Sequence, residues 1–306
     1  LEWEMLIPPD GKFTVTGTSV KSVLHSVPAC QKIVKKAIVD RLSEAYGISE
    51  FPETGAEYTV KATLLKDRVT LTVDTSGVGL HKRGYRTSDV TAPIKETLAA
   101  AMIQLSFWRD DRLLIDPCCG SGTIPIEAAM IGRNVAPGIN RHFASEEWEL
   151  ITEKLWKEER KSAFEAMDYD KELNIYGFDI NMKAVEAARA NAEEAGVDDC
   201  IVFKKADARK LRPEGKNGIV ITNPPYGERI GEKEEIEGIY AGFRKFFSEN
   251  PDWSLFMITT DKEAEEKAMG RKAERRRKLY NGRLETCYYQ FHGKRIKTDA
   301  DPEKER

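Results

Sequence analysis

Hydrophobic positions in residues 1–90 follow more than one period. Residues 12–16 alternate polar and apolar side chains, which is typical of a half-buried strand. Apolar residues then recur at helical spacing from Val27 to Tyr46. Two more alternating runs, Tyr58–Leu65 and Arg68–Asp74, are separated by two polar residues and predict a hairpin. This order of elements predicts a small α/β unit.

From Arg112 onward, short apolar runs alternate with stretches of helical spacing. The expected strands cover residues 113–116, 173–179, 201–203, 218–222 and 253–259, and the expected helices cover residues 123–131, 181–195 and 236–247. Strands that alternate with helices of this length form a mostly parallel, doubly wound α/β sheet of the Rossmann-like kind. A final β-rich run over residues 283–292 is expected to pair antiparallel at the edge of this sheet.

Glycines separate these two regions. They interrupt regular structure between Gly77 and Asp89, which predicts a hinge, and a helix is expected from Ile94 to about Leu105. Residues 133–170 break the alternation of strand and helix, so we interpret them as an insertion over the ligand edge of the sheet. The predicted domains are residues 1–89, including the linker, and residues 90–306, with the insertion near residues 133–172.

Composition and charge restrict the possible classes of protein. Of the 306 residues, 41% are hydrophobic and 32% are charged, which is typical of sizeable cores under a polar surface. No apolar stretch approaches the roughly 18 residues that a membrane-spanning helix needs, and no signal-peptide pattern opens the chain. The formal net charge is −3, so any binding of RNA or DNA must use local basic patches. The chain begins on Leu1 rather than Met, so we expect a preceding N-terminal piece.

The cysteines show no paired CxxC spacing. Their distribution argues against a zinc site and against a disulfide framework, so we expect no metal and a reduced, cytoplasmic location. They lie at Cys30, Cys118, Cys119, Cys200 and Cys287.

A glycine-rich segment, Asp116–Thr123, follows the first expected strand of the sheet and opens a helix. Gly120 and Gly122 allow the backbone to approach a ligand closely, and the helix N-terminus adds unpaired N–H groups. A dinucleotide fingerprint would need a third glycine where Pro125 stands, and the P-loop pattern is absent. An acidic residue at the head of such a loop suits a cationic ligand better than a pyrophosphate. S-adenosyl-L-methionine, with its ammonium and sulfonium groups, therefore fits this segment.

Two more carboxylates follow successive expected strands. Asp179 ends the second strand, where a carboxylate is expected to accept hydrogen bonds from a ribose diol. Asp207 follows the third strand and is placed to accept from the exocyclic amine of adenine. Each alone could be a helix N-cap, but three carboxylates at successive strand ends favour one cofactor pocket. The predicted cofactor-binding residues are Asp116, Cys118, Gly120, Gly122, Thr123, Asp179, Ile180, Asp207, Ala208 and Asn223.

The fourth expected strand ends in Asn223-Pro224-Pro225-Tyr226. Neither proline can donate a ladder hydrogen bond, so the strand must stop and present Asn223 at its C-terminal tip. The Asn223 amide oxygen and a proline carbonyl can accept two hydrogen bonds from an NH2 group, while the Tyr226 ring can stack on a base. A simple turn between strand and helix would also favour Asn and Pro. Because the tetrapeptide follows three carboxylates at the preceding strand ends, we predict that it is catalytic.

Two basic segments are candidates for contact with nucleic acid. In the first, Lys82, Arg83 and Arg86 would contact phosphate and Tyr85 would stack on a base, although the segment could also be a mere linker. The second, residues 271–278, is the most basic run in the chain. A solvated helix face beside several glutamates would explain that run equally well.

The motifs in combination resemble a known family. Residues 90–292 look like a class I S-adenosylmethionine-dependent methyltransferase of the kind that methylates amino groups, and residues 1–90 resemble a THUMP-type RNA-binding domain. The pairing of the two resembles the bacterial guanine-N2 methyltransferases of 23S ribosomal RNA. The likeness is carried by Asp116-Pro-Cys-Cys-Gly-Ser-Gly-Thr, Asp179, Asp207, Asn223-Pro-Pro-Tyr-Gly-Glu-Arg229, Arg83-Gly-Tyr-Arg86 and Ala136-Pro-Gly-Ile-Asn-Arg141.

This resemblance implies methyl transfer from S-adenosyl-L-methionine to the N2 amine of a guanosine in RNA, most readily 23S ribosomal RNA. It implies catalysis by residues 223–226 and adds Arg229 to the residues expected to contact RNA. The tetrapeptide alone does not separate guanine N2 from adenine N6 in DNA. Guanine-N2 methylation of transfer RNA and a non-catalytic role in ribosome assembly stay open. A nicotinamide dehydrogenase is disfavoured by Pro125 and by the absence of a histidine near a strand tip.

Overall fold

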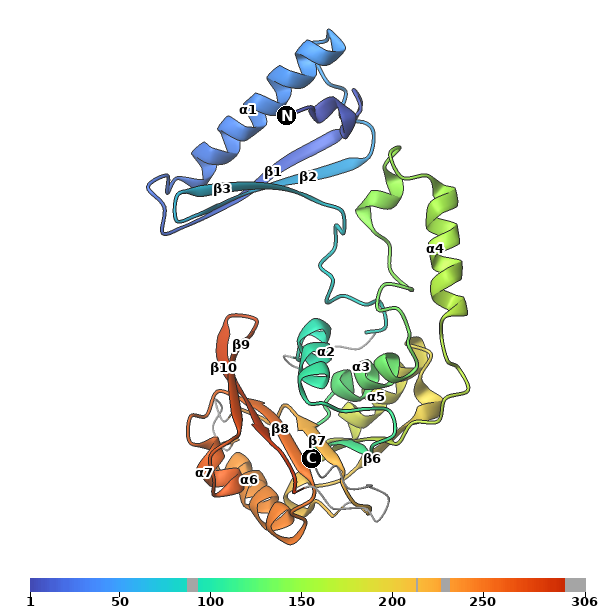
Figure 1. Cartoon of the computed structure of the whole chain (residues 1–306), viewed down its shortest axis with the longest axis vertical. Helices are drawn as coiled ribbons and strands as arrows, with labels where there is room; N and C mark the ends of the chain where they lie inside the picture. Colours follow the sequence, from blue (N-terminus) through green and yellow to red (C-terminus); the bar gives the residue numbers. More distant parts are fainter. Residues whose placement is uncertain (87–92, 213, 227–231, 295–306) are drawn as a thin grey trace, which may run out of the picture. The chain divides into compact units, whose positions relative to one another are not determined.

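The computed structural model of the chain describes residues 1–86, 93–212, 214–226 and 232–294 (Figure 1). The chain forms two compact units, which are described separately. The first contains Leu1–Leu80 and Arg141–Ser162, and the second contains His81–Asn140 and Ala163–Arg306. No helix among the described residues combines the length and the apolarity needed to cross a membrane.

The first unit is a three-stranded sheet with a long helix against it (Figure 1). Strand β1 (Lys12–Val20) pairs parallel with β2 (Glu57–Leu65), which pairs antiparallel with β3 (Arg68–Asp74). Helix α1 (Val27–Tyr46) packs on β1, and Gly47 caps its C-terminus in the left-handed conformation, with a φ of 68°. The predicted strand, helix and hairpin are confirmed, and a short 3-10 helix, η1 (Trp3–Met5), precedes them.

The core of the first unit includes a side chain from far along the chain. Trp148 is buried, stacks on Tyr58 with ring centroids 4.8 Å apart, and donates from Nε1 to the Glu57 carbonyl at 3.0 Å. It lies in the segment expected to cover the ligand edge. The structure corrects that expectation for Arg141–Ser162, which belong to the first unit because a large aromatic side chain completes its core. The segment contains η2 (Ala144–Glu147) and the start of α4 (Glu153–Glu165).

The second unit is built on a seven-stranded sheet in the order β6-β5-β4-β7-β8-β10-β9. The first five strands in that order are parallel, and β10 (Leu284–Phe291) runs antiparallel between β8 and the edge strand β9 (Arg275–Asn281). This is the predicted mostly parallel, doubly wound sheet. The parallel strands are β4 (Leu114–Asp116), β5 (Ile175–Asp179), β6 (Ile201–Lys205), β7 (Ile219–Thr222) and β8 (Ser254–Thr259).

Two hydrophobic clusters hold helices against the two faces of this sheet. In β7, Ile219 and Ile221 belong to one cluster and Val220 to the other, as expected of successive side chains on a strand. One cluster contains residues of α2 (Glu96–Leu105), α3 (Thr123–Gly132) and α5 (Met182–Glu194). The other contains residues of α6 (Glu232–Glu249) and α7 (Ala264–Met269). Short 3-10 helices, η3 (Asp198–Cys200) and η4 (Ala208–Lys210), flank β6.

The basic run at residues 271–278 differs from its helical interpretation. Residues 275–281 form the edge strand β9, in which exposed and half-buried side chains alternate. The expected glutamate partners are present, because Arg276 pairs with Glu265 and Arg271 with Glu274. The two-residue turn after β9 opens on Gly282, whose φ is 64°. A glycine at the first position of a two-residue loop before a β-rich run is a hairpin signal, so this strand could have been predicted.

Candidate functional site

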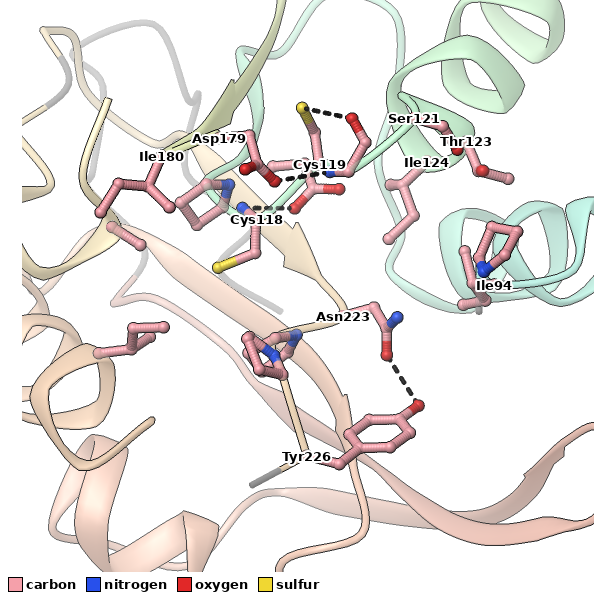
Figure 2. Close-up of a pocket in the computed structure, with 18 of the residues that line it drawn as sticks. Ile94, Cys118, Cys119, Ser121, Thr123, Ile124, Asp179, Ile180, Asn223 and Tyr226 are labelled. Atoms are coloured by element: carbon pink, nitrogen blue, oxygen red, sulfur yellow. Dashed lines mark hydrogen bonds between the residues drawn. The ribbon is translucent and has the colours of Figure 1, made fainter. Parts of the chain in front are cut away.

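A cavity of about 720 Å³ opens where the parallel strands of the second unit end (Figure 2). That edge is where open α/β sheets bind ligands. Of the predicted cofactor and catalytic residues, Gly122 alone does not line the cavity. The predicted residues that line it are Asp116, Cys118, Gly120, Thr123, Asp179, Ile180, Asp207, Ala208, Asn223, Pro224, Pro225 and Tyr226.

The loop after β4 is held open by glycines and anchored by its neighbour strand. Gly120 and Gly122 have φ values of 52° and 82°, which residues with a Cβ rarely adopt. The Gly120 N–H donates to Asp179 Oδ2 at 3.0 Å, and Cys119 N–H donates to the carbonyl of Phe178 at 2.8 Å. A Cβ on Gly122 would lie 2.9 Å from that of Ala188. Gly122 therefore shapes the loop from behind rather than facing the cavity.

Asp116 is a buried carboxylate in the wall of the cavity. Burial raises its pKa to about 7, although hydrogen bonds from Thr222 Oγ1 at 2.8 Å and Cys118 N–H at 3.1 Å oppose that rise. The nearby charge of Asp179 raises the pKa further. The same burial raises the pKa of the Cys118 thiol, which therefore stays neutral. Asp116 would gain from a cationic partner that stabilises its ionised form.

The other two carboxylates already have partners. Besides Gly120 N–H, Asp179 accepts from Asn181 N–H through Oδ1 at 2.8 Å, so backbone groups fix its orientation. Asp207 binds the guanidinium of Arg209 through both oxygens, and this hydrogen bonding lowers the pKa of Asp207. Arg209 also lines the cavity and was not predicted. Its contact with Asp207 depends on the short helix η4, which was not predicted from the sequence.

At the end of β7, Asn223 and Tyr226 face each other across a short turn (Figure 2). The Tyr226 hydroxyl donates to Asn223 Oδ1 at 2.8 Å, and it accepts from Asn281 Nδ2 at 3.2 Å. Asn281 ends β9, so the edge hairpin contributes to the same cavity together with Gly282 and Leu284. These three residues escaped prediction because 58 positions (281 − 223) separate Asn281 from Asn223, and only the sheet order brings them together.

The segment expected to contact RNA is largely internal to the second unit. Tyr85 is 3% exposed and its hydroxyl donates to Glu127 at 3.1 Å, so the expected stacking on a base does not fit the structure. The side chains of Arg83 and Arg86 are 10% and 15% exposed and pair with Glu127 and Glu96. Lys82 is exposed.

Arg229, which was expected to contact RNA, lies outside the described residues. Two sequence assignments do not fit the structure: base contact by Tyr85, and phosphate contact by Arg83 and Arg86. Both fail for one physical reason: the side chains already bind the buried carboxylates of Glu127 and Glu96. RNA contact by Arg229 stays a prediction.

Comparison with sequence families gives two matches. A family described as "RMKL-like, methyltransferase domain" matches residues 83–290, and the THUMP domain family matches residues 1–74. The "Putative RNA methyltransferase YpsC" of Bacillus subtilis (strain 168) is 50% identical over 296 residues, which is 96% of this chain and 77% of that protein. The "Ribosomal RNA large subunit methyltransferase K/L" of Shewanella baltica (strain OS195) is 37% identical over 87% of this chain, which spans 39% of that longer protein.

Solved structures agree with the sequence families. A structure described as "SMU.472, a putative methyltransferase complexed with SAH" superposes with a TM-score of 0.88 and 45% sequence identity. The match covers 97% of this chain and 79% of that one. It thus includes both units and the cavity between the strand ends and the β9–β10 hairpin.

Proposed function

Because this chain belongs to the RMKL-like methyltransferase family and uses S-adenosyl-L-methionine, we propose that it methylates the exocyclic N2 amine of a guanosine in RNA. We further propose that the RNA is 23S ribosomal RNA. The observation that carries the proposal is the position of Asn223, whose amide lies at a strand end in the wall of the same cavity as Asp116 and Asp179.

The residues of the cavity fit the cofactor. Asp116 offers a buried carboxylate whose raised pKa favours a cationic neighbour, which suits the ammonium of the methionine end. Asp179 is oriented by Gly120 and Asn181 and suits the ribose diol. Asp207 would accept from the adenine amine if Arg209 shares or releases its carboxylate. When bound, the cofactor supplies a methyl group activated by a sulfonium.

Asn223 and Pro224 would hold the amine that receives the methyl group. The lone pair of an exocyclic amine is delocalised into the base, so the amine is a poor nucleophile. The Asn223 amide oxygen and the Pro224 carbonyl would accept its two N–H groups and favour a pyramidal nitrogen. The contribution is positioning and electrostatics, without a covalent intermediate. The N–C bond would form as the S–C bond breaks, with S-adenosyl-L-homocysteine as the product. The nitrogen becomes acidic as the bond forms, so it would release one proton to water without a strong base.

The substrate amine has to replace a hydrogen bond that is already present. The Tyr226 hydroxyl now donates to Asn223 Oδ1, the acceptor proposed for the amine. When a base enters, that hydroxyl would keep its hydrogen bond from Asn281, and the ring would stack on the base, which must first leave its helix. Before the substrate binds, the Tyr226 hydroxyl therefore keeps the Asn223 amide oxygen hydrogen-bonded at the site where the amine would bind.

The choice of RNA over DNA is supported by the THUMP domain match over residues 1–74. The choice of the large ribosomal RNA is supported by the name of the relative from Shewanella baltica. The net charge of −3 implies that RNA binds through local patches rather than a uniformly basic surface.

Mass-spectrometric mapping of nucleosides from cells that lack the gene tests the proposal. We expect one N2-methylguanosine to disappear from 23S ribosomal RNA and to return when the gene is restored. Restoration with Asn223→Ala should fail. Loss of N2-methylguanosine from transfer RNA, or of N6-methyladenine from DNA, would replace the proposed substrate by one of those alternatives. An unchanged set of modified nucleosides, together with a defect in ribosome assembly, would instead favour a non-catalytic role.

A further inference from the structure

We propose that Arg86 is a positioning residue for the cofactor. It holds the cofactor-binding loop in place through hydrogen bonds to Ser121 and Thr123, and its role is not contact with RNA. The inference rests on the cofactor site proposed above and deepens it. Arg86 is not among the residues that line the cavity, but three of its hydrogen-bond partners, Ile94, Ser121 and Thr123, are. Figure 2 shows Ser121 and Thr123 on the side of the pocket that faces Ile94.

The guanidinium of Arg86 joins two separate segments that line the cavity. Nη1 donates to Ser121 Oγ at 2.9 Å, and Nη2 donates to Thr123 Oγ1 at 3.0 Å. On its other side, Nε donates to Glu96 Oε1 at 3.0 Å and Nη2 donates to the carbonyl of Ile94 at 3.3 Å. The loop between β4 and α3 and the segment leading into α2 are therefore tied to one planar group.

The cofactor loop depends on side chains from outside it. The loop lies between the end of β4 at Asp116 and the start of α3 at Thr123, and its Gly120 and Gly122 have positive φ values. Asp179 holds Gly120, and Asn191 Nδ2 donates to the carbonyl of Ser121 at 3.0 Å. The Ser121 side chain accepts its hydrogen bond from Arg86, and the described residues provide no other hydrogen bond to that hydroxyl. Loss of Arg86 should therefore loosen the loop without removing any group from the cavity wall.

A second group of buried side chains from the same segment binds helix α3. Tyr85 and Arg83 both bond to Glu127, which follows Thr123 by four positions and so lies on the same face of α3. Glu127 is 2% exposed, and burial raises both its pKa and that of Tyr85. Removing one partner from such a buried charged network is costly, because a buried charge is left uncompensated. This group fixes the start of α3, on which the loop ends.

Only an arginine fits the position of Arg86. Its planar fork can reach the two hydroxyls and the carboxylate together, whereas the ammonium of lysine is a point charge on a flexible stem. The variant Arg86→Lys therefore keeps the charge opposite Glu96 and loses the fork. The variant Ser121→Ala removes the acceptor at the loop and leaves Arg86 and Glu96 in place.

Calorimetric titration of the full chain with S-adenosyl-L-methionine tests the inference. We expect Arg86→Lys to weaken binding by about tenfold or more, the equivalent of one charge-assisted hydrogen bond. Ser121→Ala should weaken binding as well, and the double variant should bind no worse than Arg86→Lys alone, because both remove the same contact. Binding of 23S RNA transcribed in vitro should stay within about twofold of the wild type.

Two controls accompany these variants. Lys82→Ala removes an exposed cation from the same segment, and Ser254→Ala removes a buried hydroxyl from β8 in the same unit. Neither should change the affinity for the cofactor. Thermal unfolding without ligand shows whether each variant is folded.

Three results would overturn the inference: cofactor affinity of Arg86→Lys within twofold of the wild type, additive losses in the double variant, or weaker RNA binding with unchanged cofactor binding. If Arg86→Lys fails to fold, Ser121→Ala decides alone, and a wild-type affinity there overturns the inference. A wild-type chain that binds no S-adenosyl-L-methionine would refute the proposed cofactor site instead, so the two failures are distinguishable.

Discussion

Single side chains in this protein carry roles that follow from where water can reach them. Asp116 and Asp179 are both acidic residues at strand ends, yet one is buried in the cavity wall and the other is half-buried and hydrogen-bonded to backbone N–H groups. Burial disfavours the charged form of a carboxylate and raises the pKa of Asp116 to about 7. Its protonation is therefore coupled to any cation that binds beside it.

Cofactor affinity should depend on pH through Asp116. A cationic ligand stabilises the ionised carboxylate and lowers its pKa, so binding should be strongest above pH 7 and weaken as the pH falls below about 7. The limiting slope is about tenfold per pH unit for one proton. Calorimetry between pH 5.5 and 8 measures the slope, and Asp116→Asn is the control that should flatten it. An equal slope in both proteins would show that another group titrates.

Asn223 should matter to turnover and not to cofactor binding. Its amide is assigned to the substrate amine, so Asn223→Ala should lower kcat by about 100-fold, or about 2.7 kcal/mol, as loss of one preorganised polar group does. Tyr226→Phe keeps the ring and frees the amide oxygen, so it should retain most of the turnover. Transfer of labelled methyl to ribosomal RNA from cells lacking the gene measures both. Near-normal turnover of Asn223→Ala would mean that the amide is only structural.

Among the elements, the β9–β10 hairpin extends from the sheet edge into the site. The hairpin places Asn281, Gly282 and Leu284 in the wall of the cavity. Two of its basic side chains are paired with carboxylates, Arg276 with Glu265 and Lys278 with Glu285. Its contact with the proposed catalytic tetrapeptide is the hydrogen bond that Asn281 donates to Tyr226.

The variant Asn281→Ala tests the role of this hairpin. Loss of one neutral hydrogen bond is worth about 1 kcal/mol, so kcat/KM for RNA should fall by about fivefold while cofactor affinity is unchanged. In a Tyr226→Phe background the same change should have no further effect, because the acceptor hydroxyl is already gone. Equal losses in the two backgrounds would mean that Asn281 acts independently of Tyr226.

On the scale of the whole molecule, the chain passes between its two units more than once. Residues 141–162 leave the methyltransferase part of the sequence and contribute Trp148 to the core of the THUMP-containing unit. All residues that line the cavity belong to the other unit. Changes in the first core should therefore affect stability without altering cofactor binding.

Trp148→Ala should destabilise the first unit by about 3–5 kcal/mol, the usual cost of removing a large buried aromatic side chain. Denaturant unfolding followed by circular dichroism measures this loss, and calorimetry should show unchanged affinity for S-adenosyl-L-methionine. Leu150→Ala is the matched control, because Leu150 lies in the same segment and is 65% exposed. A loss of cofactor affinity in Trp148→Ala would show that the units are coupled energetically.

Local sequence patterns were enough to predict most of the elements and most of the residues that line the pocket. Hydrophobic period separates strand from helix locally, and parallel strands bring their C-terminal residues to one edge, so Asp116, Asp179, Asp207 and Asn223 could be placed together without coordinates. The Asn-Pro-Pro-Tyr segment stops its strand for reasons contained in its own backbone chemistry. Family membership followed from these motifs in order.

Local patterns could not show which polar side chains face water, because that depends on how distant segments pack. Arg83, Tyr85 and Arg86 have the composition of an RNA-binding loop, yet the structure pairs them with carboxylates inside the second unit. Glu127 is 42 positions from Tyr85, and Glu96 is 10 positions from Arg86, beyond the end of the predicted hinge. Trp148 and Asn281 were likewise assigned by contacts across many residues of chain. Local patterns report the period of an element, whereas the partner of a charge or an aromatic ring depends on how distant segments pack.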